Sequence, residues 1–282
     1  MILFAAGGSV AIRFTYTELA PFWSGAARFM CSSIFFWAVV LIRKLELPRG
    51  RALMGAILFG VFSMGLPFVF IYWGLVKTPA SLYQMFSALI PLLTLFLAFF
   101  HRLEPFRSRG LLGAGLSVIG IGVALGGAVG GELAVPYVLA IIAGVACLAE
   151  AGIIAKSFPP LDLYVTNAIA TLSGGLIMLA ASFLSGEKMA IPGQPTATIA
   201  FTYTVIFATI IAYLLYLYVL AHWTASGLSY SFVIIPLVTA VIANTLAKEQ
   251  ITIQFGIGGA LIVMGVWIGA LLPSKQKQPQ AE

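Results

Sequence analysis

The chain has 282 residues, of which 61% are hydrophobic and only 9% are charged, and its mean hydropathy is +1.06. Soluble domains carry about 25% charged residues, so a chain this poor in charge is expected to fold in lipid. The formal charge of +6 does not indicate nucleic-acid binding, because the basic residues flank apolar segments as they do in membrane proteins.

Charged residues and turns with Pro or Gly divide the chain into apolar segments. A helix needs about 20 apolar residues to cross a bilayer, and most of these segments are that long. We therefore expect an all-α integral membrane protein with ten transmembrane helices, near residues 1–14, 21–43, 51–75, 79–100, 109–130, 133–155, 162–184, 197–220, 225–246 and 252–272.

The first of these segments is short, because only twelve residues precede Arg13. They would form about 18 Å of helix. There are three explanations: the true start of the first helix is missing from this sequence, the helix is unusually short, or the segment is a cleaved signal peptide. A signal peptide needs a basic region at its start, which is missing here, so we expect a truncated or short first helix.

The Lys and Arg residues outside the helix interiors predict the orientation. One side of the membrane would receive ten of them, among them Arg43, Arg102 and Lys156, and the other side four, namely Arg13, Lys77, Lys188 and Lys248. Cytoplasmic loops are the basic ones, so both termini are expected in the cytoplasm of a bacterial cell, with the protein in its inner membrane. Residues 273–282 form a polar tail.

An internal repeat follows from shifting the sequence by 145 residues, which aligns Pro91 with Pro236. Residues 75–120 then match residues 220–265 at 13 of 46 positions without a gap, including paired Ser, Thr, Glu and Gly. This offset equals five helices, and an odd number inverts the second copy. We expect two inverted five-helix repeats, residues 1–130 and 131–272, around a central cavity, which is an architecture of secondary transporters.

The paired prolines lie inside apolar segments, where proline leaves a carbonyl without its usual donor. That carbonyl belongs to Ser87 in the first repeat and to Phe232 in the second. Membrane helices tolerate proline where neighbours satisfy the carbonyl. Pro91 and Pro236 are therefore hinge candidates, and simple packing kinks are the alternative.

The last helices of each half carry a family resemblance. The stretches "HRLEPFRSRGLLGAGLSVIGIGVALGG" and "SYSFVIIPLVTAVIANTLAKEQITIQFGIGGALIVMGVWIGALL" combine a mid-span proline, a short loop with Glu and a Gly-rich helix. This pattern resembles the EamA type of the drug/metabolite transporter superfamily. The resemblance implies ten helices, cytoplasmic termini and a cavity lined by both halves. Many such proteins export amino acids or other small metabolites, and aromatic amino-acid exporters are among them.

Helical spacing from the two prolines selects the candidate cavity residues. Small residues at this spacing also suit close helix packing, which is the alternative. The candidates are Tyr83, Gln84, Ser87 and Thr94 in the first repeat and Ser229, Phe232 and Thr239 in the second, together with Tyr213 deeper in the eighth segment. Aromatic residues near helix ends are expected in the interfacial belt instead, namely Tyr72, Trp73, Tyr216 and Tyr218.

Two charged residues fall inside predicted helices. A charge at mid-bilayer costs about 2.5–3.5 kcal/mol, so such residues usually face protein or water. Arg28 could hold a structural partner or contact substrate. Glu150 could bind a substrate ammonium, carry a coupling proton or reach toward the cytoplasmic surface. Glycines at four-residue spacing, Gly122, Gly126 and Gly130, and Gly265 and Gly269, are expected to pack helices together.

These patterns favour a secondary transporter that exports amino acids or similar metabolites by alternating access. A drug or nucleotide-sugar transporter of the same superfamily is the alternative, although the expected cavity helices offer no cation at mid-depth for a phosphorylated substrate. A membrane-embedded enzyme is disfavoured, because the chain has one aspartate, Asp162, and no HExxH motif. We expect no cofactor, metal, ATP or nucleic acid, and a monomer is plausible while the oligomeric state stays open.

Overall fold

The computed structural model describes residues 1–102, 108–128, 135–222, 228, 231–249 and 251–271. Every regular element in this part of the chain is helical. The α-helices of the first half, before residue 130, are α1 (Ile2–Thr15), α2 (Pro21–Ile42), α3 (Gly50–Gly60), α4 (Leu66–Leu75), α5 (Ala80–Ser87), α6 (Ile90–Phe100) and α7 (Ser108–Ala128). Those of the second half are α8 (Val135–Ser157), α9 (Leu163–Leu184), α10 (Pro195–Val205), α11 (Ala212–His222), α13 (Ser231–Ala247) and α14 (Ile253–Val266).

Three short π-helical segments interrupt this pattern: η1 (Val61–Gly65), η2 (Ile206–Ile211) and η3 (Trp267–Leu271). η1 joins α3 to α4, and η2 joins α10 to α11. Their first residues are 145 positions apart, the offset of the sequence repeat. Such widened turns are frequent at functional sites.

Each of the first two π segments has a local cause. Pro67 lacks the N–H that would bond the carbonyl four residues earlier, and that carbonyl belongs to Ser63 in η1. In η2, the hydroxyl of Thr209 donates to the carbonyl of Thr204 at 2.8 Å, five residues back. A side chain inserted into the backbone ladder in this way widens the turn.

The two prolines proposed as hinges lie in different local structures. α5 and α6 meet at an angle of 41°, and Pro91 lies in the first turn of α6. Pro236 lies in the interior of α13, which is continuous from Ser231 to Ala247. A break at the proline is therefore present in the first half only, among the residues that the structure describes.

The length and composition of the helices agree with an all-α integral membrane protein. Among the described residues, five helical stretches are long and apolar enough to cross a membrane, and the bent pair α5–α6 makes a sixth. The other apolar helices, including α1, are shorter. Each of the ten predicted segments contains helix.

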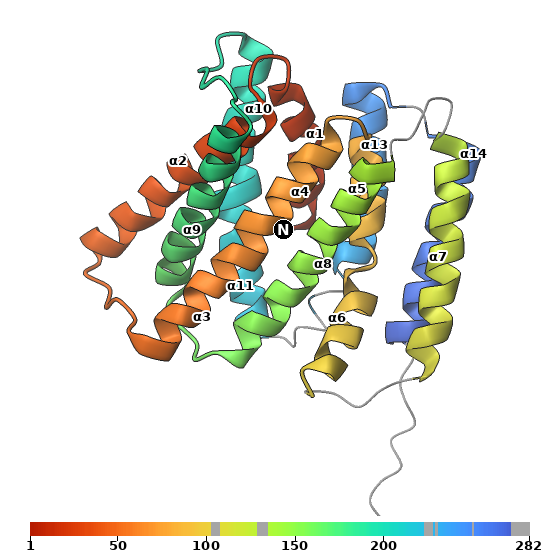
Figure 1. Cartoon of the computed structure of the whole chain (residues 1–282), viewed down its shortest axis with the longest axis horizontal. Coiled ribbons are helices and arrows are strands. Elements are labelled where there is room, and N and C mark those ends of the chain that lie inside the picture. The colour runs from red at the N-terminus through yellow and green to blue at the C-terminus, as the bar shows by residue number, and fades with distance from the viewer. Residues whose placement is uncertain (103–107, 129–134, 223–227, 229–230, 250, 272–282) are drawn as a thin grey trace, which may run out of the picture.

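Helices α7 and α14 pack against each other along glycines and lie side by side at one edge of the molecule (Figure 1). Gly113 faces the carbonyl of Gly265, and Gly120 faces the carbonyl of Gly258, so the two helices are antiparallel. The expectation for Gly122 was wrong, because no atom lies within 4 Å of a Cβ built there. Gly126 and Gly130 lie outside the residues whose surroundings are described.

The two halves share one buried core. Its largest cluster includes Phe29 and Ile71 of the first half and Val145 and Met178 of the second. Tyr72 is fully buried in this cluster, so its assignment to the interfacial belt was wrong. Trp73 and Tyr218 are 40% and 55% exposed, and their place in the interfacial belt stays a prediction.

The two ends of the molecule differ in the connections that they hold. The basic end, at the bottom of Figure 1, holds the connections 43–49 and 158–162 and the C-terminal end of α6. The carboxylate end, at the top, holds the connections 16–20, 76–79 and 185–194. Long helices run between the two ends.

Candidate functional site

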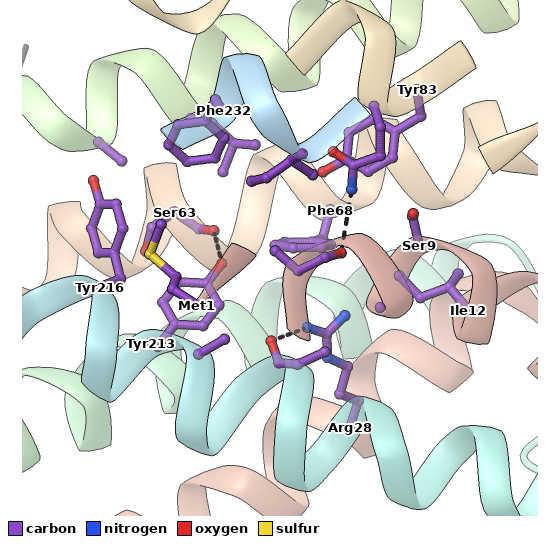
Figure 2. Close-up of a pocket in the computed structure, with 18 residues that line it drawn as sticks. Met1, Ser9, Ile12, Arg28, Ser63, Phe68, Tyr83, Tyr213, Tyr216 and Phe232 are labelled. Atoms are coloured by element: carbon purple, nitrogen blue, oxygen red, sulfur yellow. Dashed lines mark hydrogen bonds between the residues drawn. The ribbon is translucent and has the colours of Figure 1, made fainter. Parts of the chain in front are cut away.

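A central cavity of about 110 Å³ lies between the two halves. Its walls come from α1, α2, η1, α4 and α5 of the first half and from α8, η2, α11 and α13 of the second. Most of the lining side chains are aliphatic or aromatic, and a few polar groups converge among them (Figure 2). This combination is typical of a binding site for a small molecule.

Both π segments offer a backbone carbonyl at the cavity wall. The carbonyl of Ser63 in η1 accepts a hydrogen bond from the Tyr213 hydroxyl at 2.9 Å. The carbonyl of Ala208 in η2 accepts one from Nη2 of Arg28 at 3.0 Å. Ser63 and Ala208 both line the cavity and are 145 residues apart. The repeat therefore places two irregular turns at equivalent positions beside the same cavity.

Arg28 from α2 is the one charged side chain among the described residues that line this cavity. The residue is 2% exposed. Its Nε donates to the Thr209 hydroxyl at 2.6 Å, and its Nη1 lies 3.4 Å from the Tyr72 hydroxyl. The guanidinium carbon lies 5.0 Å and 5.1 Å from the ring centres of Phe29 and Phe68, within the range of cation–π attraction.

Aromatic residues of α5, α11 and α13 form much of the remaining wall. Tyr83, Tyr213 and Phe232 line the cavity (Figure 2). Tyr216 also lines it, so the prediction that Tyr216 lies in the interfacial belt was wrong. Tyr213 and Tyr216 are one turn apart, with ring centres separated by 6.3 Å. Helical spacing brings both rings to the same face of α11.

Gln84 lines the cavity beside Tyr83. Its amide nitrogen donates to the Ala5 carbonyl at 3.4 Å, and its side-chain oxygen accepts from the Ser87 hydroxyl at 2.9 Å. Ser87 does not itself line the cavity. It holds the amide of Gln84 instead, so its effect on the site is indirect.

The other residues expected at the site have different surroundings. Thr94 lines a small adjoining pocket of about 10 Å³, together with Phe232 and Tyr216. Thr239 is fully buried, and its hydroxyl lies 3.4 Å from the Ala6 carbonyl, between α13 and α1. Ser229 lies outside the described residues.

Glu150 is not among the residues that line the central cavity. Its Oε1 lies 2.8 Å from Nε2 of His101, at the C-terminal end of α6, so this contact joins the two halves. The second carboxylate oxygen, Oε2, is buried and has no hydrogen-bond partner in the described part of the chain. Of the alternatives for Glu150, direct substrate contact has no support from this geometry.

Besides Tyr216, sequence reasoning missed three features of the site. The argument that the cavity offers no cation was wrong, because Arg28 lines it. Pro67, four residues after Ser63, was an available signal for a free carbonyl in η1. No comparable signal marks Ala208, because its carbonyl is used by a residue that is distant in sequence.

A second cavity of about 360 Å³ opens near the basic end, between α3, α8, α11 and the connection 158–162. Phe59 lines this cavity and Tyr216 lines the central one. Their rings stack at 6.4 Å with an interplanar angle of 18°. Each cavity is therefore lined by one ring of this stacked pair.

At the carboxylate end, glutamates of one half bind backbone N–H groups at the start of helices in the other half. Glu187 accepts from the amides of Phe22 and Trp23 at 3.0 and 2.7 Å, at the start of α2. Glu18 accepts from the amides of Gly193 and Gln194 at 2.8 and 2.9 Å, just before α10. Carboxylates are stabilising at helix N-termini, which have unsatisfied donors and a positive dipole end.

Glu249 makes the most extensive of these contacts, at the start of α5. It accepts from the Ala80 amide at 3.0 Å, from the Ser81 amide at 3.2 Å and from the Ser81 hydroxyl at 2.7 Å. It also pairs with Arg13 of α1 at 2.6 Å. These contacts hold the two halves together at the carboxylate end.

The comparisons with known proteins agree with this architecture. The model of the EamA-like transporter family matches the chain twice, over residues 1–126 and 135–270. A protein described as an uncharacterized inner membrane transporter, YedA of Escherichia coli strain K12, is 24% identical over 250 residues, which cover 86% of this chain and 78% of that protein.

Two further matches extend over more of the chain. A protein described as an uncharacterized transporter of Archaeoglobus fulgidus is 23% identical over 267 residues, 92% of this chain and 91% of that protein. A solved crystal structure matches with a TM-score of 0.70 at 20% identity, covering 96% of this chain and 94% of the other. That likeness shows a shared fold.

Proposed function

The chain belongs to the EamA-like transporter family through both of its halves, and we propose that it is a secondary transporter that exports amino acids or similar small metabolites by alternating access. The observation that carries this proposal is the central cavity, which is lined by both halves and lies beside two π-helical turns at equivalent repeat positions. Sites at the interface of two repeats, beside interrupted helices, are characteristic of secondary transporters.

We propose ten membrane spans, in two inverted repeats that comprise residues 1–130 and 131–272. The contacts between α7 and α14 support the inversion. Gly113 and Gly258 are equivalent in the repeat, as are Gly120 and Gly265. Gly113 meets Gly265 and Gly120 meets Gly258. Such an exchange of partners is what a two-fold axis perpendicular to antiparallel helices produces.

The proposed orientation puts the basic end in the cytoplasm. It rests on the ten Lys and Arg residues predicted on that side, against four on the other. The name of the Escherichia coli relative, an inner membrane transporter, supports a bacterial inner membrane location. Both termini would then face the cytoplasmic side, with Met1, at the start of α1, in the wall of the central cavity.

The proposed transport cycle opens the two ends in turn. Glu18, Glu187 and Glu249 close the carboxylate end through contacts between the halves. The second cavity, at the basic end, would admit substrate from the cytoplasm, and the Phe59–Tyr216 stack would separate it from the central site. Export requires that the carboxylate contacts break after the substrate has entered.

The competing functions fit this site less well. A nucleotide sugar carries several negative charges, whereas Arg28 is the one charged side chain among the described lining residues of a cavity of about 110 Å³. Drug export by a member of the same family is the main alternative function, with drugs in place of amino acids as the substrate class. The relatives described above are named as transporters, which favours transport over enzymatic chemistry.

Uptake into liposomes that contain the purified protein tests the proposal. The panel would comprise radiolabelled aromatic and aliphatic amino acids, with and without a pH gradient. Saturable uptake of at least one compound, absent from empty liposomes, is the expected result. No uptake of any amino acid would contradict amino-acid export and point to another metabolite or a drug.

The replacement Pro91→Ala is expected to slow transport more than Pro236→Ala. Alanine restores an N–H that can bond the Ser87 carbonyl, which would straighten the 41° bend between α5 and α6. We expect about a fivefold lower rate, because a barrier higher by ~1 kcal/mol has this effect. Transport rates are measured in liposomes and divided by the amount of folded protein.

The matched control for this pair is Pro192→Ala, in the connection 185–194, which should leave the rate unchanged. Full transport rates in both Pro91→Ala and Pro236→Ala would remove the hinge role.

A further inference from the structure

The buried guanidinium of Arg28 lies over the rings of Phe29 and Phe68, but it has no carboxylate partner among the described residues. Its three hydrogen-bond partners, Thr209, Ala208 and Tyr72, are all neutral. The close contacts between a basic and an acidic side chain in the described part of the chain are Arg13–Glu249 and His101–Glu150, and neither includes Arg28. A buried cation without a carboxylate is costly, and charged residues inside membrane proteins usually pair with one another or with backbone carbonyls and mark substrate pathways.

The geometry leaves part of the guanidinium free to bind. The three hydrogen bonds occupy one N–H each of the five that arginine carries. Thr209 and Ala208 hold Nε and Nη2 from η2, so the group is fixed in orientation at the cavity wall (Figure 2). A fixed, planar guanidinium with free donors is suited to a carboxylate.

The wall away from Arg28 is suited to an apolar body. Tyr83 and Phe232 lie on the opposite side of the cavity in Figure 2, and Phe68 lies between them and the guanidinium. Among the described lining residues there is no Asp or Glu, because Glu150 lies elsewhere. A substrate ammonium group would therefore find no carboxylate in these walls.

We propose that the central cavity takes a small apolar monocarboxylate, whose carboxylate pairs with Arg28 and whose apolar body packs against the aromatic wall. This inference rests on the proposed transport function and narrows its substrate class. The Arg28 guanidinium can pair with one carboxylate, and Met1 also lines this cavity. The carboxylate is required, and an α-ammonium group is dispensable.

Matched probes test this inference on the purified full chain. The probes are 3-phenylpropanoate, its neutral amide 3-phenylpropanamide, and phenylalanine, which adds the ammonium group. Binding is measured as the shift of the thermal unfolding midpoint in detergent, and transport as counterflow in liposomes. We expect the acid to bind at least about tenfold more tightly than the amide, since a hydrogen bond between charged groups is worth that much.

Variants then assign the preference to Arg28. Arg28→Gln should bring the acid and the amide within about twofold of each other, and Arg28→Lys should retain part of the preference because it keeps the charge. Arg43→Gln is the matched control, since Arg43 also lies over an aromatic ring, that of Tyr164 at 4.9 Å, but outside the cavity. It should leave the preference unchanged.

The outcomes separate this inference from the proposed function. Equal binding of acid and amide by the wild-type protein, or binding of phenylalanine but not of 3-phenylpropanoate, would overturn the inference even if transport is observed. Specific binding of the acid without transport of any compound would uphold the inference and contradict the transport function. If Arg28→Gln does not fold, the wild-type probe pair and Arg28→Lys still decide the question.

Discussion

Replacing Gly120 by leucine is expected to reduce the yield of folded protein by more than tenfold. A Cβ at this position would lie 2.7 Å from the Gly258 carbonyl oxygen and 2.9 Å from the Ile262 amide nitrogen. Both are backbone atoms, so α7 and α14 would have to separate. Overpacking commonly costs about 1–3 kcal/mol, and separating two helices adds to this cost.

The yield is measured as the monodisperse peak in size-exclusion chromatography after extraction in detergent. Gly258→Leu, from the opposite helix, should give the same result, because its Cβ would meet the Gly120 carbonyl oxygen at 2.5 Å. Gly122→Leu is the matched control on α7, since no atom lies within 4 Å of its Cβ. A comparable loss in Gly122→Leu would show that the leucine, rather than the glycine contact, is responsible.

The replacement Glu249→Gln is expected to open the carboxylate end of the protein. The Glu249 side chain is 9% exposed, binds donors at the start of α5 and pairs with Arg13. The substitution removes the negative charge and replaces one acceptor oxygen by an NH2 group, which is a donor. That NH2 group would face the donors that now bind the carboxylate. If the closed state is destabilised relative to the open state by ~1.4 kcal/mol, the population of the open state rises about tenfold.

Labelling of the cavity from outside measures this opening. Ser9 lines the cavity and is replaced by cysteine as the labelling site. The two native cysteines, Cys31 and Cys147, are first replaced by alanine. We expect a membrane-impermeant maleimide to label Ser9→Cys about tenfold faster when Glu249→Gln is present, in line with that shift in population.

Two further variants distinguish the parts of this contact. Arg13→Gln should have a smaller effect, because the Arg13 side chain is 38% exposed and its ion pair is weakened by solvent. Glu46→Gln, in the exposed connection 43–49 at the basic end, is the control and should label as the parent does. Unchanged labelling in Glu249→Gln would show that this carboxylate does not hold the end closed.

The helices were predictable because their signals are local in sequence. Long apolar segments bounded by charges gave boundaries close to those of α2, α8 and α9. The 145-residue offset was equally visible, and η1 and η2 now begin at positions related by the same offset. The sequence contained no sign of π-helical turns, except for Pro67.

The site was only partly predictable, because the face that a helix turns toward a cavity depends on its partners. Tyr83, Gln84, Tyr213 and Phe232 line the cavity, whereas Ser87 and Thr239 lie behind its wall. Tyr216 was assigned to the interfacial belt from its distance to a helix end, but it lies one turn from Tyr213 on the cavity side. Distance along a helix does not indicate rotation about its axis.

The sequence by itself determined that this protein is an all-helical membrane protein with an internal repeat and an EamA-type pattern. These properties depend on composition and on spacing along one chain. Only the tertiary structure decided that Arg28 lines the central cavity and that Glu150 pairs with His101 instead. Both outcomes depend on contacts between residues more than 40 positions apart, which form only when the two halves pack together.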